Sequence, residues 1–547
     1  MIFPDRTHYC GSVTKEKVDQ TVTVMGWVHQ KRVVGKKLAF IDLRDREGII
    51  QLVFTQAKID IEGINKISLE SVIWATGKVV MRKNANPELK TGEIEVLVEQ
   101  YELISNSLDL PFAMHGFIDV QEEVRQKFRY IDLRRPEILS KSVQLRHKTS
   151  LAIWNTMDSM GFYHVETPIL LKSTPEGARD FLVPSRIHQG KFYALPQSPQ
   201  ILKQLLMVGG IDKYFQIAKC FRDEDLRADR QPEFTQIDIE MSFIKQEDIF
   251  RMAEILMQDV FKNVLQVELI TPFPRFTYQE VKSKYGSDKP DLRIKNYYVD
   301  IDKKKLIKAK MKLNEGEQYK ILTVKGITDE ELQKIISDSG LTSEQVQIHD
   351  SNTLIVKTNA KGYLSDEHEN LRRLIGKKTE KIAENEFNFS WVVDFPLFDW
   401  SENDQKITPS HHPFTAPNPD DVELLDEQPL NVRAYAYDLI LNGYEIGGGS
   451  IRIHNSELQK KIFELINLKI EEAEMRFGFL LEALKYGAPP HGGMAFGLDR
   501  LLMVMAGEES IKEVITFSKT KIETDLLSGA PDTVDKEQLD ELGIKLK

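Results

Sequence analysis

The chain has 547 residues, 41% of them hydrophobic and 29% charged, which is ordinary globular composition and enough length for roughly two to four domains. No apolar run approaches the roughly 18 residues that span a bilayer, and the first residues lack the basic-then-apolar pattern of a secretion signal, so we expect no membrane association. Two cysteines exclude a disulfide framework and a cysteine-rich zinc site, which favours a cytoplasmic protein.

The net charge of −11 argues against a general nucleic-acid binder, because phosphate contacts need cations. The charge is uneven, however: residues 1–106 hold 15 Lys and Arg against 14 Asp and Glu, so the acidic excess lies in the rest of the chain. A local basic surface at Lys31, Arg32, Lys36 and Lys37 and a merely solvated loop are both compatible with this pattern.

Residues 1–106 have the pattern of an all-β domain. Residues 37–54 predict a strand, a turn and a second strand, and two more strands are expected at 71–82 and 92–104 after a short helical stretch near 62–70. With the first strand, marked by Val22, Val24 and Val28, this is the order of a five-stranded OB β-barrel, a fold that often binds oligonucleotides.

One side of the second predicted strand carries an aromatic residue among charges. Ile41 and Leu43 point one way, whereas Phe40, Asp42 and Arg44 point the other. Phe40 can stack on a nucleic-acid base there, or it can be an aromatic residue of the core or its rim, and the pattern alone leaves both readings open.

The rest of the chain divides by texture. Residues 107–135 show little periodicity and predict a hinge or connector. Residues 136–293 form the first part of a β-rich catalytic domain, opened by a helix that includes Leu145, Ile153 and Met157. Residues 294–390 are Lys-rich and helical in parts, which indicates an inserted α+β domain. The β-rich texture returns in 391–547, which also holds a C-terminal extension. The expected fold class is therefore α+β multidomain.

Two of the predicted strands place polar side chains on one face. Residues 214–224 put Gln216, Arg222 and Glu224 together, and residues 233–243 put Phe234, Gln236, Asp238 and Glu240 together, opposite an apolar face. Such a pair is a plausible floor for a polar ligand, although an ordinary surface sheet shows the same alternation.

A second hairpin is marked by Asn442-Gly443, a strong signal for a two-residue turn. Counting outward pairs Ile440 with Glu445, so Asp438 and Glu445 share a face. The two carboxylates repel each other unless a cation or protons lie between them. Mg²⁺ with nucleotide phosphates suits this arrangement, and a protonated or solvent-separated pair is the alternative.

Three glycines follow, Gly447-Gly448-Gly449, and then Arg452. Glu445 and Arg452 are seven positions apart, so in a regular strand they would face opposite ways. We predict a β-bulge among the glycines that brings both onto one side, and regular pairing from 444 to 453 would contradict this prediction.

The third element, residues 491–507, is a Gly-rich strand that runs into an apolar helix with Arg500 near its first turn. Arginine at a helix N-terminus suits phosphate, because backbone N–H groups and the helix dipole add to its charge. The sequence has no G-x-x-x-x-G-K-[ST] loop, no G-x-G-x-x-G at a helix start, no His-Glu-x-x-His and no Gly-x-Ser-x-Gly. We therefore expect an ATP-using enzyme centred on Arg222 and Arg500, with ATP held by arginines on an antiparallel sheet.

These segments together resemble a known family. Gly161-Phe162 through Thr167-Pro168, Phe221-Arg222-Asp223-Glu224 and Gly497-Leu498-Asp499-Arg500 are similar to the three motifs of class II aminoacyl-tRNA synthetases. Residues 173–186, 193–207, 220–240 and 411–415 resemble, more narrowly, the bacterial-type aspartyl-tRNA synthetases. The likeness covers most of 1–290 and 391–530. It implies an OB-fold anticodon-binding domain, a class II antiparallel catalytic sheet, and a homodimer formed through the first motif.

The resemblance also implies substrates and roles. The substrates would be ATP, L-aspartate and tRNA(Asp), with Mg²⁺ as cofactor. Arg452 and Lys203 would hold the aspartate side-chain carboxylate. The further expected aspartate contacts are Asp238, Ser198 and Gln200 at the amino end, Arg222 at the reacting carboxylate, and Glu176, His411 and His412 in loops that close over the amino acid. Two cations around the side chain would reject the neutral amide of asparagine.

At the nucleotide, Arg222 would bind the α-phosphate, Glu224 would read the adenine amino group, and Phe234 would stack on one face of the base. Arg500 would cover the other face and reach the γ-phosphate, so Arg222 and Arg500 are the expected catalytic residues. Further expected ATP contacts are Asp223, Gln231, Glu445, Gly497, Leu498 and Asp499, and the expected Mg²⁺ ligands are Asp438 and Glu445. The expected anticodon contacts are Phe40, Arg44, Gln51 and Arg82.

Three alternatives compete with this reading. A synthetase of relaxed specificity would also charge tRNA(Asn), and the sequence does not decide this. An enzyme of the same fold that makes a free metabolite, such as an asparagine synthetase, would not need the N-terminal barrel. A catalytically dead tRNA-binding protein would not need Arg222, Glu224, Asp438, Glu445 and Arg500 together.

Overall fold

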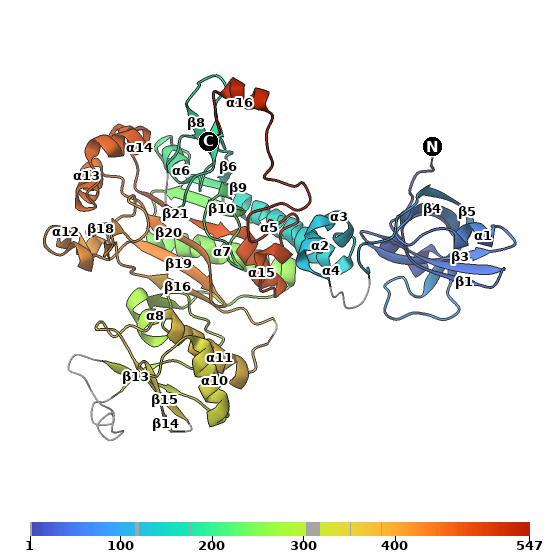
Figure 1. Ribbon diagram of the computed structural model, residues 1–547, viewed down its shortest axis with the longest axis horizontal. Coiled ribbons are helices and arrows are strands. Elements are labelled where there is room, and N and C mark those ends of the chain that lie inside the picture. Colours follow the sequence, from blue (N-terminus) through green and yellow to red (C-terminus); the bar gives the residue numbers. More distant parts are fainter. Residues whose placement is uncertain are drawn as a thin grey trace. The chain divides into compact units, whose positions relative to one another are not determined.

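The computed structural model describes residues 3–114, 120–174, 177–301, 318–350, 352–383 and 385–546 (Figure 1). The chain forms two compact units. The first comprises Met1–Gln144 with Thr516–Thr520 and Thr524–Asp532, and the second comprises Leu145–Ile515 with Lys521–Glu523 and Thr533–Lys547. No helix of the described residues is long and apolar enough to cross a membrane.

The first unit contains a closed five-stranded barrel with strand order β1-β2-β3-β5-β4. Inward-facing aliphatic side chains such as Val24, Ile41 and Leu52 fill its interior completely. The three strands, one helix and two strands occur in the predicted order, so the predicted OB barrel is confirmed. The bounds are η1 Cys10–Ser12, η2 Lys15–Lys17, β1 Thr21–Val34, β2 Leu38–Asp45, β3 Gly48–Thr55, α1 Ile61–Asn65, β4 Val72–Met81 and β5 Ile94–Ser105.

The predicted connector contains short helices. They are α2 Glu122–Lys127 and α3 Arg129–Asp132. After the predicted connector come α4 Pro136–Leu139 and the π-helical turn η3 Ser140–Gln144. Asp132 is fully buried and accepts from Arg125, Arg129 and Arg135, which holds the segment together. The first compact unit ends after this turn, nine residues beyond the expected connector boundary at 135.

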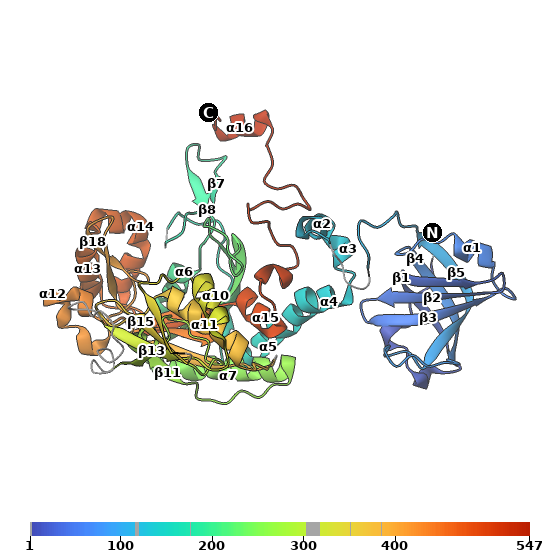
Figure 2. The same ribbon diagram turned by 60° about the horizontal axis from the view of Figure 1, so that its bottom comes forward.

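The second unit is built on an eight-stranded sheet of order β11-β16-β19-β20-β21-β10-β9-β6. Helices α5, α7 and α15 pack on one face, where Ile153, Leu256 and Leu502 meet Ile237 and Phe496 of the sheet (Figures 1 and 2). The other face of the sheet carries the cavity that is described in the next subsection. The strand bounds are β6 Tyr163–His164, β9 Lys213–Phe221, β10 Glu233–Ser242, β11 Arg275–Thr277, β16 Phe389–Val393, β19 Ala436–Leu441, β20 Tyr444–Ile451 and β21 His491–Gly497.

The remaining elements of this unit lie around the sheet. The β7–β8 hairpin projects away from it (Figure 2). The helices are α5 Leu145–Ser159, α6 Gln200–Val208, α7 Gln246–Leu265, α8 Tyr278–Lys284, α12 Leu424–Glu427, α13 Ser456–Leu465, α14 Ile470–Ala483, α15 Leu498–Ala506 and α16 Lys536–Leu542. The hairpins are β7 Leu182–Pro184 with β8 Phe192–Ala194, and β17 Phe398–Ser401 with β18 Lys406–Pro409. Single 3-10 turns are η4 Pro419–Asp421, η5 Pro429–Asn431, η6 Leu484–Tyr486 and η7 Ile511–Glu513.

The predicted insert lies between α8 and β16 and has its own sheet and core. Its elements are β12 Val299–Asp300, β13 Tyr319–Thr323, α10 Asp329–Ser339, β14 Val346–Asp350, β15 Thr353–Lys357 and α11 Asp366–Thr379, with sheet order β12-β13-β15-β14. Fully buried Arg372 of α11 donates to the backbone carbonyls of Asp291, Ile294 and Asn296. These bonds fix α11 to the segment that leads from the main sheet into the insert.

Candidate active site

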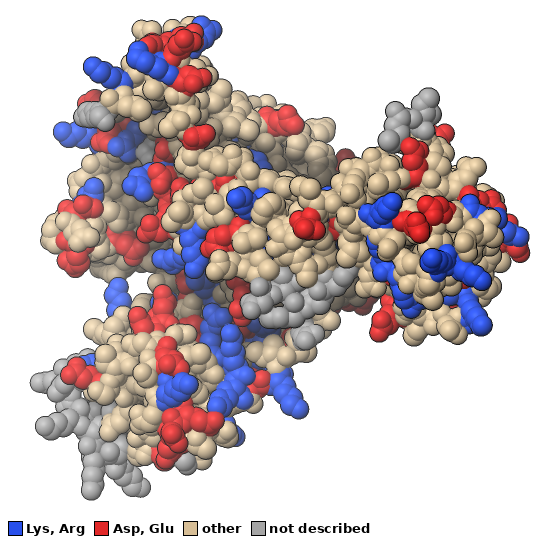
Figure 3. All heavy atoms as spheres, turned by 45° about the vertical axis from the view of Figure 1, so that its right-hand side comes forward, with Lys and Arg blue, Asp and Glu red and all other residues tan. Residues whose placement is uncertain are grey.

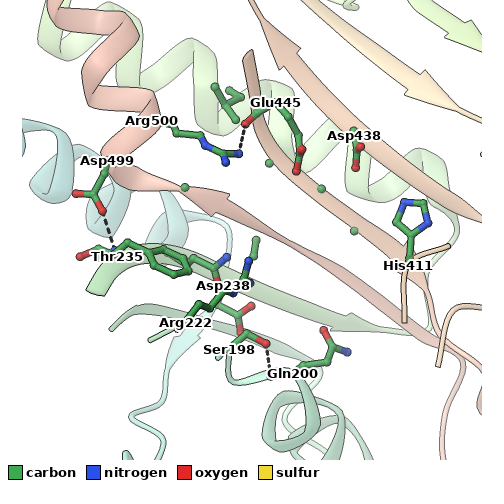
Figure 4. A pocket seen from close by; sticks show the side chains of 18 of the residues that line it. Ser198, Gln200, Arg222, Thr235, Asp238, His411, Asp438, Glu445, Asp499 and Arg500 are labelled. Carbon is green, nitrogen blue, oxygen red and sulfur yellow. Dashed lines mark hydrogen bonds between the residues drawn. The ribbon is translucent and has the colours of Figure 1, made fainter. Parts of the chain in front are cut away.

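A cavity of about 380 Å³ lies on the face of the eight-stranded sheet opposite α5 and α7 (Figure 4). Strands β10, β19, β20 and β21, the loop that follows β9, the start of α6, the start of α15 and the segment 411–415 all reach it. Most of the predicted site residues line it together: Ser198, Gln200, Lys203, Arg222, Glu224, Gln231, Phe234, Asp238, His411, His412, Asp438, Glu445, Arg452, Gly497, Asp499 and Arg500. Polar side chains from all three sequence segments therefore converge.

The alternation predicted for β10 is confirmed. Phe234, Gln236 and Asp238 face the cavity, whereas Ile237 and Ile239 belong to the core on the other side. Because β10 lies between β9 and β21 in the sheet, the polar face of this strand forms the middle of the cavity floor.

At one end of the cavity four charged side chains are buried with alternating sign. Lys203 Nζ lies 2.6 Å from Asp238 Oδ1 and 3.3 Å from Glu240 Oε2. Arg452 forms a two-pronged pair with Glu240, from Nε to Oε1 at 3.0 Å and from Nη2 to Oε2 at 3.2 Å. Each of the four side chains is at most 2% exposed. We call these four residues the charge quartet, and its formal charges cancel.

The surroundings act differently on the two acids of the quartet. Burial raises the pKa of Asp238, although Lys203 opposes that rise. Burial also acts to raise the pKa of Glu240, but Arg452 and Lys203 together hold it below the ordinary value. Glu240 is therefore the firmly ionised member, and the two cations are organised around it.

Every N–H of the Arg452 guanidinium has a partner within the protein. Besides the pair with Glu240, Nη1 contacts Ser450 Oγ at 2.8 Å and His412 Nε2 at 2.7 Å, and Nη2 donates to the Gly493 carbonyl at 3.4 Å. Burial and the neighbouring Arg452 hold the pKa of His412 well below its ordinary value, so this imidazole is neutral. A ligand carboxylate that reaches Arg452 must replace one of these contacts.

Two buried polar side-chain atoms at this end lack a hydrogen-bond partner among the described residues. They are Asp238 Oδ2 and Gln200 Nε2. A buried carboxylate oxygen without a donor is costly, and an ammonium group is the partner that suits it. This end of the cavity thus offers cations for a carboxylate and an acceptor for an ammonium group.

The opposite end is organised by arginines that are less engaged. The guanidinium carbon of Arg222 lies 5.1 Å from the ring centre of Phe234. The described residues provide this side chain with no hydrogen bond or ion pair. Glu224 is paired instead with Arg230, from Oε2 to Nη1 at 2.9 Å. The donors of Arg222 are therefore available to an anionic ligand.

Arg500 lies in the first turn of α15, as predicted, and links two walls of the cavity. Its Nη2 lies 3.1 Å from Asp229 Oδ2, and its Nη1 donates to the Glu445 carbonyl at 3.0 Å. The guanidinium thus connects the loop between β9 and β10 with the start of β20.

The paired carboxylates and the predicted bulge are both present, with one correction. Ile440 pairs with Glu445, but Leu439 pairs with Gly447, so Ile446 is the extra residue. The bulge lies immediately before the three glycines and not among them, because the buried Ile446 side chain packs into the core. As predicted, the bulge brings Glu445 and Arg452 onto the cavity side.

A bare backbone lies beside the two carboxylates. A Cβ atom on Gly448 would lie 2.3 Å from Asp438 Oδ1 and 3.7 Å from Glu445 Oε1, so both acids converge over this glycine. Burial and the neighbouring Glu445 raise the pKa of Asp438 well above its ordinary value. Two convergent carboxylates fit Mg²⁺, which takes one or two carboxylates and completes its shell with phosphate oxygens and water.

Some predicted residues lie elsewhere. Asp223 does not line the cavity, and its Oδ1 lies 3.1 Å from Arg179 Nη2. Leu498 is buried in the core. Asp499 lines the cavity, but both of its oxygens accept hydrogen bonds from the protein, namely from Arg146 and from Thr235 N. The prediction for Glu176 lies outside the described residues.

The predicted anticodon residues lie on the barrel. Phe40 is half-buried, with the Arg32 guanidinium carbon 4.7 Å from its ring centre. Gln51 donates to Glu95 Oε2 at 2.7 Å and accepts from Arg82 Nη2 at 2.5 Å. Gln51, Arg82 and Glu95 therefore form one hydrogen-bonded group, and Phe40 lies on β2, the strand that pairs with the strand of Gln51.

Arg44 differs from the prediction. Its side chain is only 3% exposed, and its terminal nitrogens contact Glu70 Oε2 at 2.6 Å and His29 Nδ1 at 2.5 Å. The alternation correctly placed Arg44 away from the apolar interior, but it could not show that Glu70 covers this end of β2. A guanidinium buried in such a pair is not presented to RNA.

The sequence did not identify Asp229, Arg230, Thr235 and Ser450, which line the cavity. Gln236, which lines the cavity, and Glu240, which completes the quartet, were predicted as part of the polar face of β10 but without a role of their own. Asp229 and Arg230 lie in a loop dense in charge, where the sequence does not show which side chains turn inward.

Comparison with known proteins agrees with this geometry. Residues 121–521 match a family described as class II tRNA synthetases (D, K and N), and residues 22–104 match the OB-fold nucleic acid binding domain. An aspartate–tRNA ligase of Macrococcus caseolyticus is 47% identical over 99% of this chain and 98% of its own. An aspartate–tRNA(Asp/Asn) ligase of a Thermoanaerobacter species is 45% identical over the same shares.

Solved structures show the same architecture at low identity. The asparaginyl-tRNA synthetase of Pyrococcus horikoshii with asparaginyl-adenylate has a TM-score of 0.64 and 20% identity, covering 95% of this chain and 99% of its own. An aspartyl-tRNA synthetase from Leishmania major has the same TM-score and identity, with 94% of each chain covered. These likenesses support the fold.

Proposed function

Because the chain belongs to the class II tRNA synthetases of the D, K and N group, we propose that it is an aspartate–tRNA ligase. It joins L-aspartate to ATP, forming aspartyl-adenylate and pyrophosphate, and then transfers the aspartyl group to the 3′ end of tRNA(Asp). The relatives that are 45–47% identical over nearly their whole length support the choice of aspartate.

The charge quartet is the observation that carries the choice of amino acid. A bound aspartate has one ammonium group and a side-chain carboxylate. Asp238 Oδ2 suits the ammonium group, and Lys203 and Arg452 suit the carboxylate, which replaces His412 or Ser450 at the guanidinium. The amide of asparagine would leave one cation incompletely paired, and a lysine side chain would meet two positive charges.

The first step needs positioning more than proton transfer, because the aspartate α-carboxylate is already ionised. Arg222 binds the α-phosphate and the attacking carboxylate, and Arg500 reaches the γ-phosphate from α15. Phe234 and Arg500 enclose the adenine, and Glu224, released from Arg230, accepts from its amino group. Gln231 and Gly497 complete the nucleotide walls. Mg²⁺, held by Asp438 and Glu445, would neutralise phosphate charge.

The barrel supplies the anticodon site. Phe40 stacks on a base beside Arg32. The amide of Gln51 is buried between Arg82 and Glu95, so Gln51 acts on a base edge by holding these two side chains in place. Lys and Arg side chains are spread among carboxylates over this part of the surface, and they can meet backbone phosphates (Figure 3).

A second candidate function is the charging of tRNA(Asn) as well. The Thermoanaerobacter relative, 45% identical over 99% of this chain, is an aspartate–tRNA(Asp/Asn) ligase. Both activities share the amino-acid end of the cavity, and they differ only in the tRNA that is accepted.

The enzyme acts in the cytoplasm as a homodimer. Apolar side chains at the first family motif support the dimer, since Leu151 and Trp154 of α5 and Tyr163 of β6 are 41–67% exposed on the described surface. Burying them against a second copy removes this apolar area from water. Sedimentation equilibrium tests the dimer, and Leu151→Glu should convert it to monomer.

ATP–pyrophosphate exchange with each amino acid tests the proposed function. Aspartate should be the amino acid that supports exchange, and purified tRNA(Asp) should then accept labelled aspartate. Exchange that is equal without aspartate would overturn the proposal. Charging of purified tRNA(Asn) with aspartate decides the second candidate.

A further inference from the structure

Asp499 directly precedes Arg500 in the first turn of α15, and its side chain is buried. One oxygen, Oδ1, accepts from Nη2 of Arg146 on α5. The other, Oδ2, accepts from the backbone N–H of Thr235 in β10 at 2.8 Å (Figure 4). Both oxygens of this cavity residue are therefore used by donors of the protein itself.

The two partners of Asp499 adjoin the two sides of the nucleotide slot. Thr235 follows Phe234, the stacking residue of β10, and Asp499 precedes Arg500, which forms the opposite side. The carboxylate thus joins the two chain segments that carry the slot. A shift of roughly 1 Å between reacting or binding groups can cost about a hundredfold in rate, so this link matters for the slot width.

Arg146 completes the link from behind. It does not line the cavity, and besides Asp499 it donates to the Val514 carbonyl at 3.2 Å. A buried carboxylate next to bound triphosphate would repel it, but the guanidinium supplies a positive charge on the side away from the ligand.

We propose that Arg146 and Asp499 are positioning residues that set the separation of Phe234 and Arg500 and thereby the affinity for ATP. They act without contacting the nucleotide. The proposal rests on the proposed use of ATP at this site, and it assigns Asp499 a different role from the direct ATP contact expected from its motif.

The chemistry of the link suggests the variants. In Asp499→Asn, both partners are donors, so the amide can satisfy only one of them and presents its own N–H to the other. Arg146→Met keeps much of the side-chain volume and removes the charge, and Arg146→Lys keeps the charge and loses one of the two contacts. Lys148→Met, which removes an exposed cation two residues along α5, is the matched control.

Aspartate-dependent exchange gives KM for ATP, KM for aspartate and kcat of each variant. Arg146→Met and Asp499→Asn should each raise KM for ATP about ten- to a hundredfold, with KM for aspartate within about twofold of the wild type. Arg146→Lys should lie between, and Lys148→Met should match the wild type. The double variant should be no worse than Asp499→Asn alone, because the amide no longer faces a guanidinium.

Three results would overturn the proposal: an unchanged KM for ATP in Arg146→Met, an equal rise in KM for aspartate, or multiplied effects in the double variant. If Arg146→Met fails to fold, Arg146→Lys carries the same test. If the wild type shows no exchange with aspartate, the proposed function fails instead. Calorimetric titration of the variants with a non-hydrolysable ATP analogue then decides the role of the link.

Discussion

At one end of the cavity, Lys203 and Arg452 are almost fully buried and each contacts a buried carboxylate. At the other end, Arg222 has no ion pair within the described residues and lies over an aromatic ring. In the first arrangement the two cations already contact groups of the protein, so a ligand carboxylate must replace one of those contacts. The second leaves its donors for the ligand. Selection among similar amino acids suits the first, and stabilisation of charge during the reaction suits the second.

Arg222→Ala should have the largest effect on activity, because it removes the donors that remain for the α-phosphate. Exchange should fall about a thousandfold or more. Thermal stability should stay near that of the wild type, since no partner is left unpaired. Calorimetry and exchange kinetics measure the two quantities, and exchange above about a tenth of the wild-type rate would contradict the role of Arg222.

Arg452→Met, at the quartet, should lower the thermal stability clearly, whereas Arg222→Ala should leave it nearly unchanged. It leaves Glu240 buried with Lys203 as its remaining cation, and breaking a buried pair costs about 3–5 kcal/mol. The melting temperature should fall clearly, and aspartate use should be lost. Adding Glu240→Gln should restore much of the stability but not the activity. A double variant as unstable as the single one would show that packing, and not charge, limits this end.

Gly448→Ala tests the cation site between the two ends. The new Cβ would meet Asp438 Oδ1 and approach Glu445 Oε1, while the backbone conformation of this glycine is one that alanine tolerates. The apparent KM for Mg²⁺ and ATP should rise about tenfold or more, with KM for aspartate little changed. Gly478→Ala, where a Cβ has open space, is the control.

The raised pKa of Asp438 predicts how metal use responds to pH. Mg²⁺ binds the deprotonated carboxylate, so a proton competes with the ion at pH values where an ordinary Asp would already be ionised. As the pH falls below this raised pKa, the Mg²⁺ concentration for half-maximal exchange should rise about tenfold per pH unit. Asp438→Asn should flatten this dependence, and a pH-independent requirement in the wild type would contradict it.

Phe40→Ala should have the smallest effect on the exchange reaction in the cavity, because the barrel takes no part in the proposed adenylate formation. Loss of one base–aromatic stack costs about 1–3 kcal/mol, so KM for tRNA should rise about tenfold. Exchange without tRNA should be unchanged at both ends of the cavity. A variant that loses exchange as well would show that Phe40 supports the fold and not the RNA contact.

The sequence predicted the parts of the site that follow from chain-local geometry. The polar face of β10, the Asn442-Gly443 hairpin and the position of Arg500 depend on alternation, turn chemistry and helix start signals, and all three are present. The bulge was required by the spacing of Glu445 and Arg452, but its position at Ile446 depends on core packing that spacing does not contain.

Contacts between distant segments were not predictable in this way. Glu240 lies on the predicted polar face, yet its pairing with Arg452 brings together residues 212 positions apart. Arg44 has the right alternation for an RNA contact, and only the closure of the barrel places Glu70 over it. Asp499 likewise has a partner on α5, 353 positions away. Pattern gives the direction of a side chain, and folding decides what it meets.

Because Ile446 is an extra residue in β20, the arrangement of the site depends on the number of residues in this strand. In the proposed function Glu445 serves the nucleotide end and Arg452 the amino-acid end. The two share a face because β20 contains that one unpaired residue. Deletion of Ile446 would leave every other side chain chemically intact and would turn one of the two ends toward the core. The hairpin therefore tolerates substitution better than insertion or deletion, and its residue count is itself part of the active site.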